Sequence, residues 1–244
     1  MLILAIDTST RAGSIALLRD RDVLAEISAR EDTPFSTRLF RDLELLQTRA
    51  AFRMNQIDVF AVAAGPGSFT GLRVGLTAVK GWAEIHQKPI AAISGLEAIA
   101  AQAKTNDGVR ALLGARRIEV ISPFLDARRG HVFGSTYRRS GEPRILKLVG
   151  QEAILSAEEF LALVKANCGT RPAMLVSPTP DVLPPDLVES ILPGARMEGV
   201  SASLAPMIGR LGFDRANRGD LVDPLGLDAN YIRRSDAETA RTDT

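Results

Sequence analysis

The chain has 244 residues, of which 45% are hydrophobic and 24% are charged. These proportions are close to those of an average globular protein, and they exclude disorder as a description of the whole chain. Lysine and arginine together number 30 and aspartate and glutamate 29, so the formal net charge is +1. A protein whose main task is to grip nucleic acid normally has a clear basic excess. If nucleic acid is involved, we therefore expect this chain to touch it only indirectly.

Cysteine and histidine usage excludes several kinds of site. The single cysteine, Cys168, cannot form an internal disulfide, and no cysteine pair predicts zinc. The only histidines are His86 and His131, and they form no HxxxH or HExxH pattern. Without a GxSxG elbow, a Ser-His-Asp triad is also disfavoured. We expect no metal site, with His86 near a helix end and His131 on a strand surface.

The N-terminal sequence and the hydrophobic runs indicate a cytoplasmic protein. The opening run MLILAI has no basic leader and meets an acid at Asp7, unlike a signal peptide. No stretch approaches the roughly 18 uncharged apolar residues of a membrane helix. We therefore expect no membrane association.

The first half of the chain predicts an α/β unit. Apolar runs separated by turn residues predict an antiparallel meander, and a later continuous apolar run predicts a buried parallel strand. Helical spacing and a Ser94–Glu97 capping box predict three helices. The expected strands are 2–6, 14–18, 23–28, 59–64 and 89–93, and the expected helices are about 36–50, 71–87 and 96–103.

The second half repeats the same order of elements, which suggests two halves of one architecture. We expect strands at 119–125, 131–137, about 144–149 and 173–176. A second capping box, Ser156 with Glu159, predicts a helix to about Lys165. We expect a loop at 180–185 and a closing helix at 203–211.

The motif Asp7-Thr8-Ser9-Thr10 lies where the first strand ends. A carboxylate followed by hydroxyls and backbone amides is a plausible magnesium–phosphate site. Ser9, however, stands where a glycine would let the backbone approach a phosphate. The alternative is a hydrogen-bonded strand–turn with a solvated aspartate.

The second motif is GPGSFTGLRVG at 65–75, between a strand and a helix. Its spacing matches neither the Walker loop nor the dinucleotide fingerprint. In the helix, Gly71, Gly75 and Ala78 form a stripe of small residues beside an apolar face. Such a stripe lets another backbone come close, either the chain's own sheet or a helix of another chain.

The third motif is DARRG at 126–130, which occupies the corner of the second half that matches Asp7. The bulky Arg128 and Arg129 stand where small residues would admit a phosphate. A hairpin turn with surface charges is therefore favoured over a phosphate site at Asp126.

Together, IDTST at 6–10, GPGSFTGLRVG at 65–75, DARRG at 126–130 and Tyr231-Ile232-Arg233 resemble the TsaB (YeaZ) family of bacterial tRNA threonylcarbamoyladenosine biosynthesis proteins. The resemblance runs from Met1 to about Arg233. It implies a two-lobed actin/Hsp70/sugar-kinase-like (RNase H-like) α/β fold, with a mixed sheet flanked by helices in each lobe. We assign residues 1–105 to the first lobe, joined by about 203–233, and 106–202 to the second. Residues 234–244 are expected to be a disordered tail.

The resemblance implies a non-catalytic subunit rather than an enzyme. It would scaffold and activate the catalytic paralogue TsaD, together with the ATPase TsaE, in threonylcarbamoylation of the adenosine next to the anticodon (position 37) of tRNA. It implies no catalytic residue and no cofactor of its own, with ATP or ADP used by the complex. The chain departs from the family at Phe35, where histidine is common, and at Ser177–Asp181, which lacks a usual glycine. The second departure weakens any residual nucleotide site at Asp7, Thr8, Ser9 and Asp126.

The resemblance also implies a pairing surface on the first two helices, used by a homodimer when the chain is alone and by the paralogue in its place. The matching residues are Leu39, Phe40, Leu43, Gly71, Leu72, Gly75, Leu76 and Ala78. We expect Gly75→Leu to abolish partner binding and to leave the fold intact. The competing hypotheses are a free-standing ATP-dependent kinase that uses Asp7 and Asp126, and a metallopeptidase, which the unpaired histidines disfavour.

Overall fold

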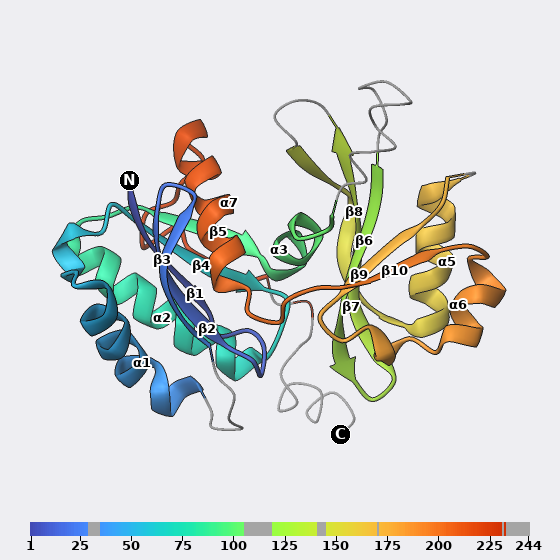
Figure 1. Ribbon diagram of the computed structural model, residues 1–244, viewed down its shortest axis with the longest axis horizontal. Coiled ribbons are helices and arrows are strands. Elements are labelled where there is room, and N and C mark those ends of the chain that lie inside the picture. Colours follow the sequence, from blue (N-terminus) through green and yellow to red (C-terminus); the bar gives the residue numbers. More distant parts are fainter. Residues whose placement is uncertain (29–34, 105–118, 141–144, 170, 231, 233–244) are drawn as a thin grey trace. The chain divides into compact units, whose positions relative to one another are not determined.

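The computed structural model describes residues 1–28, 35–104, 119–140, 145–169, 171–230 and 232. Of the late motif, Tyr231 and Arg233 lie outside these ranges, as do the expected tail and most of the polar stretch 104–108. The chain divides into two compact units, Met1–Ala98 with the segment that begins at Ser203, and Ile99–Ala202. Each unit has its own five-stranded sheet (Figure 1).

The first unit contains a mixed sheet in the order β3-β2-β1-β4-β5. Its first three strands form the predicted antiparallel meander, and β4 and β5 then add in parallel to β1, so both predictions are confirmed. The strands are β1 (Leu2–Asp7), β2 (Ser14–Arg19), β3 (Asp22–Ser28), β4 (Val59–Gly65) and β5 (Ile90–Ser94).

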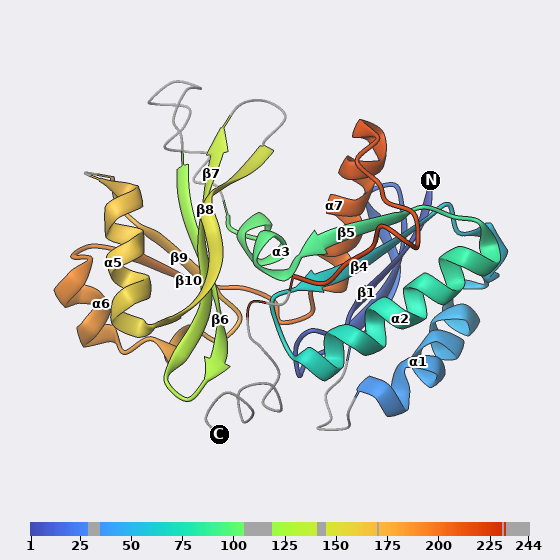
Figure 2. The ribbon, with the colours of Figure 1, turned by 180° about the vertical axis from the view of Figure 1, so that it is seen from behind.

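Helices cover both faces of this sheet, which explains why β1 and β4 are almost entirely apolar. The helices α1 (Phe35–Ala50) and α2 (Phe69–His86) lie side by side on one face, as Figure 2 shows. On the other face lies α7 (Ala205–Arg218), which approaches so closely that a side chain at Gly209 would overlap Leu18. The helix α7 continues seven residues beyond its predicted end and stops at Gly219, a glycine with a φ of 72°.

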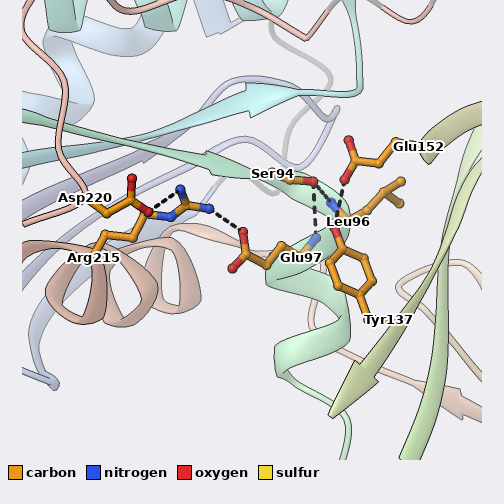
Figure 3. Close-up of polar contacts among 7 residues, drawn as sticks. All are labelled: Ser94, Leu96, Glu97, Tyr137, Glu152, Arg215 and Asp220. Carbon is orange, nitrogen blue, oxygen red and sulfur yellow. Dashed lines mark hydrogen bonds and ion pairs between the residues drawn. The ribbon is translucent and has the colours of Figure 1, made fainter. Parts of the chain in front are cut away.

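Polar contacts hold the start of the short helix α3 (Gly95–Ala101) within the first unit, which includes α3 up to Ala98. The hydroxyl of Ser94 accepts hydrogen bonds from the backbone of Leu96 and Glu97, as the predicted cap requires. The Glu97 carboxylate pairs at 2.8 Å with Arg215 of α7, which also pairs with Asp220 (Figure 3). After α7 the chain returns to the sheet edge, where Val222 bridges to Ile90. The first unit also contains the 3₁₀ helix η1 (Met54–Gln56).

The second unit has the strand order β10-β9-β6-β7-β8. The capping box at Ser156 and Glu159 is present at the start of α5, which confirms that prediction. In the same unit, the Tyr137 hydroxyl donates to Glu152 at 2.8 Å (Figure 3). The elements are β6 (Glu119–Arg128), β7 (His131–Ser140), β8 (Ile145–Ser156), α5 (Ala157–Cys168), β9 (Met174–Ser177), η2 (Pro180–Val182), α6 (Pro185–Ile191) and β10 (Arg196–Gly199).

Two parts of the second unit correct the prediction. The segment 180–185 is not simply a loop, because it contains η2 and the start of α6. The strand β10 was not predicted, since its four residues RMEG are mostly exposed and carry no apolar pattern. The elements η2, α6 and β10 are all too short for a hydrophobic period to reveal them in the sequence.

The two sheets share one topology. When the strands of each unit are numbered in chain order, both sheets have the order 3-2-1-4-5. In both, the first three strands are antiparallel and the last two add in parallel. The predicted duplicated α/β architecture of the actin/Hsp70/sugar-kinase type is therefore confirmed.

A buried ion pair anchors α1 to the first sheet. Arg38 and Asp42 are one helical turn apart, their side chains are each 4% exposed, and the guanidinium lies 2.8 Å from the carboxylate. Arg38 also donates to the carbonyl of Gly13 in the turn between β1 and β2. Breaking a buried pair is strongly destabilising, because a charge is left behind in a medium of low polarity.

We predict that Asp42→Ala lowers the free energy of unfolding by about 3–5 kcal/mol, because the buried guanidinium of Arg38 loses the carboxylate at position 42. Urea denaturation measures this. Arg41→Ala is the matched control, since Arg41 lies 3.5 Å from the same carboxylate but is 68% exposed. Its effect should stay below about 1 kcal/mol. Equal losses for the two variants would contradict the assignment.

Candidate functional site

The loop that follows β1 encloses its own carboxylate. Asp7 is fully buried, and one of its oxygens accepts hydrogen bonds from the backbone and the hydroxyl of Ser9, at 2.8 and 2.6 Å. The other oxygen accepts from the Thr10 hydroxyl at 3.2 Å. A magnesium ion would have to displace these donors. The loop is therefore the hydrogen-bonded strand–turn of the alternative interpretation, except that the aspartate is buried rather than solvated.

Burial also changes the ionisation of Asp7. Loss of hydration raises the pKa of this carboxyl above its ordinary value, and the hydrogen bonds from Ser9 and Thr10 lower it only in part. The ionised form is therefore destabilised in the folded protein relative to the unfolded chain. A carboxylate that binds a metal needs the opposite, a stable and accessible charge.

The glycine-rich block packs directly against this loop. The backbone of Ser68 donates to the carbonyl of Ser9 at 2.8 Å, and a Cβ at Gly67 would lie 2.5 Å from that carbonyl. At Gly71 a Cβ would overlap the carbonyl of Thr8, and at Gly75 it would overlap the Thr8 hydroxyl. That hydroxyl donates to the Gly71 carbonyl at 2.6 Å. Gly71 and Gly75 of α2 are thus required by the chain's own first loop.

This packing gives the small-residue stripe a role within the chain, the first of the two alternatives that its spacing left open. Gly71 and Gly75 admit Thr8 of the chain's own first loop. Of the predicted pairing residues, Leu39, Leu43, Leu72, Gly75 and Leu76 are buried within the first unit. Gly71 and Ala78 are half-buried, and Phe40 is 67% exposed. Helical spacing alone does not distinguish a buried face from a pairing face, because core and interface stripes have the same period.

The exposed face of the two helices carries a different set of residues. Phe40 of α1 meets Trp82 of α2 edge to face, with 6.3 Å between ring centroids, and Trp82 in turn packs on the buried Phe60. Ile85 is 76% exposed, and a Cβ at the exposed Gly81 would meet nothing within 4 Å. We call Phe40, Ala78, Gly81, Trp82 and Ile85 the α1–α2 surface. On α2, Ala78 is followed by Gly81, Trp82 and Ile85 at three, four and seven residues, a helical spacing that could have identified this face from the sequence.

The remaining candidate residues are not members of the α1–α2 surface. Asp126 belongs to the second unit, is exposed, and accepts a hydrogen bond from the backbone of Arg128 at 2.6 Å, so the expected hairpin turn is confirmed. His86 is the half-buried last residue of α2, and His131 is the exposed first residue of β7, both as expected.

Within the described ranges, no three His, Cys, Asp or Glu side chains are grouped so that they could hold a metal ion. No helix in the described part of the chain is both long and apolar enough to cross a membrane.

Fold and site together define a protein with a duplicated kinase-type fold. The loop after β1, where a magnesium–phosphate site was considered, is its phosphate corner, and this corner is closed because Ser9 and Thr10 hydrogen-bond to the carboxylate of Asp7. Residues 28–172 match the family model of TsaD, tRNA N6-adenosine threonylcarbamoyltransferase. The tRNA threonylcarbamoyladenosine biosynthesis protein TsaB of Bacillus subtilis is 31% identical over 238 residues, which cover 98% of this chain and 96% of that protein. The chain therefore belongs to the TsaB (YeaZ) family, and the resemblance is confirmed.

Two further similarities agree with this membership. The tRNA N6-adenosine threonylcarbamoyltransferase of Methylorubrum extorquens (strain PA1) is 39% identical over 87 residues, which cover 36% of this chain and 24% of that protein. The structure of YeaZ from Pseudomonas aeruginosa has the same fold, with a TM-score of 0.69 at 24% identity, covering 94% of this chain and 99% of that one.

We predict that Gly75→Leu destabilises the isolated protein by about 1–3 kcal/mol or more, because its side chain would displace Thr8. This corrects the expectation that the variant keeps its fold. Thermal unfolding measures it, with Gly81→Leu as the matched control in the same helix. The control should lose nothing, since leucine favours helix more than glycine does and its side chain has open space. Unfolding of both variants at the same lower temperature would refute the assignment.

We predict that Asp7→Asn becomes more stable relative to the wild type as pH rises. The raised pKa of Asp7 means that its stabilising contribution is complete below the unfolded pKa of about 4 and is lost as pH rises through the folded pKa. Asparagine does not ionise and escapes this loss. Urea denaturation from pH 4 upward measures the difference, which should grow and then level off. A difference that is independent of pH would show that the charge of Asp7 has no such role.

Proposed function

We propose that this chain is a non-catalytic subunit of the system that attaches a threonylcarbamoyl group to the adenosine at position 37 of tRNA. It scaffolds and activates a catalytic paralogue of the TsaD family, together with the ATPase TsaE. The name of the B. subtilis relative, which matches almost the whole chain, supports the pathway. The proposal places the protein in the cytoplasm, where tRNA is modified.

The observation that carries the non-catalytic assignment is the closed corner at Asp7. In a kinase of this fold the carboxylate would receive a magnesium–phosphate group, whereas here it accepts three hydrogen bonds from Ser9 and Thr10. Asp126 is likewise bonded to its own turn. We therefore prefer the scaffold to the free-standing ATP-dependent kinase, and we assign ATP or ADP to the complex rather than to this chain.

The α1–α2 surface is the proposed contact with the paralogue. It presents an exposed phenylalanine, an exposed isoleucine and the only tryptophan of the chain, the residue types that dominate interface cores. It also lies within residues 28–172, the span that matches the transferase family, so the paralogue would have related helices. A surface shared by both proteins can pair two copies of this chain, or one copy with the paralogue. Homodimer and complex would then compete.

A reconstituted reaction tests the proposed function. Unmodified tRNA is incubated with the transferase, the ATPase and the enzyme that forms threonylcarbamoyl-adenylate, with and without this chain. Digested tRNA is analysed for threonylcarbamoyladenosine by mass spectrometry. The proposal expects modification only when this chain is present, and an unchanged yield without it would overturn the proposal.

Calorimetry with magnesium-ATP and the chain alone should show no binding, while binding at useful affinity would restore the kinase hypothesis.

We predict that Gly81→Leu weakens pairing with the transferase about tenfold or more while the isolated chain stays folded. A leucine here would stand between the surfaces, whereas the fold itself leaves the position open. Gly81→Ala should raise the melting temperature and weaken pairing less. Analytical ultracentrifugation measures the affinities, with Arg53→Ala, at an exposed residue just before η1, as a control. Wild-type affinity for Gly81→Leu would exclude this face.

A further inference from the structure

The hairpin between β6 and β7 has an unusual backbone at its tip. Three consecutive residues have left-handed φ angles: Arg128 at 63°, Arg129 at 54° and Gly130 at 76°. Arg128 pairs with His131, so Arg129 and Gly130 form a two-residue turn. Turns of this kind require positive φ at both central positions and strongly favour Asn-Gly. Glycine is in its expected place, but two arginines occupy positions that bulky side chains disfavour.

Packing does not explain these two arginines. Both side chains are exposed, and within the described ranges neither guanidinium has an ion-pair or hydrogen-bond partner. The nearby acids are used elsewhere: Asp126 accepts from the Arg128 backbone, and Glu159 accepts from the Ser156 backbone. Unfavourable backbone conformations that the fold does not need are found most often at functional positions.

The chemistry of the tip fits a phosphate rather than a protein surface. Arg128, Arg129 and His131 are all exposed at this tip, and the His131 ring is 3.0 Å from the Arg129 carbonyl. Guanidinium binds phosphate oxygens through paired hydrogen bonds. The apolar residues that flank the tip in the sequence, Leu125, Ala127 and Val132, are buried, so they offer no apolar anchor of the kind that protein interfaces depend on.

We propose that Arg128 and Arg129 contact the phosphate backbone of the tRNA. This goes beyond the proposed function, because it gives the supporting subunit a direct contact with RNA where net charge predicted an indirect one. With a net charge of only +1, the chain is expected to contact RNA over a small area rather than over a broad basic face. Two arginines on one hairpin make a contact of that size. Contacts of this kind position the RNA and do not select its sequence.

The test separates the contact from the fold by replacing the arginines with residues that the turn prefers. Arg128→Gly with Arg129→Asn should raise the melting temperature, because both residues suit left-handed φ. The same variant should bind tRNA about tenfold more weakly, and the slope of log affinity against log salt should fall by about two. Anisotropy of fluorescently labelled tRNA measures binding to the isolated chain and to its complex with the transferase. The double lysine variant should keep most of the affinity.

Lys165→Ala with Arg196→Ala is the matched control, since both residues are exposed, lie in the same unit and remove the same charge. The proposal expects near wild-type binding for this control. An equal loss in both variants would show only a general charge effect and would overturn the contact, as would unchanged affinity in the hairpin variant. If the wild-type chain does not bind the transferase, only the proposed function is contradicted. The contact between the two arginines and tRNA is still decided by tRNA binding to the isolated chain.

Discussion

The contact of Thr8 with two glycines of α2 is the interaction on which the first unit depends. Its hydroxyl donates to the Gly71 carbonyl and fills the space that a side chain at Gly75 would need. This contact brings the helix against the end of β1, where Ser9 and Thr10 enclose the buried carboxylate of Asp7. One close approach therefore closes the phosphate corner and determines which face of α2 is buried.

The closed corner supports the proposal that this kinase-type fold serves without kinase chemistry. A fold does not determine a function, because activity depends on the groups presented at a site. Here the hydroxyls and amides that could have bound a phosphate satisfy the chain's own carboxylate and carbonyls instead. What the first unit presents outward is the α1–α2 surface, with Phe40 and Trp82 in contact at its centre. The carboxylate of Asp7 is closed off by hydrogen bonds, whereas the aromatic side chains of the α1–α2 surface face outward. This arrangement agrees with a subunit that acts through a partner.

Sequence patterns predicted the strands and the duplicated topology well, because apolar runs and turn residues are local signals. The capping box at Ser156 was equally clear. The patterns missed β10 and α6, which are too short to show a period, and they left the partner of Gly75 open. A helical stripe of small residues has the same spacing whether it meets the chain's own loop or another protein, so only the structure could identify Thr8 as its partner. The strained arginines at the hairpin were likewise visible only as backbone angles.

The central claim is that this chain acts through its α1–α2 surface and not through chemistry at Asp7. The most direct measurement is fluorine NMR of the chain labelled with 5-fluorotryptophan, which gives a single signal because Trp82 is the only tryptophan. Half-buried between Phe40 and Phe60, this residue senses any protein that covers the surface. The account predicts that the signal shifts or broadens when the transferase is added and stays unchanged with magnesium-ATP alone. An unchanged signal in a complex shown to form by sedimentation would contradict it.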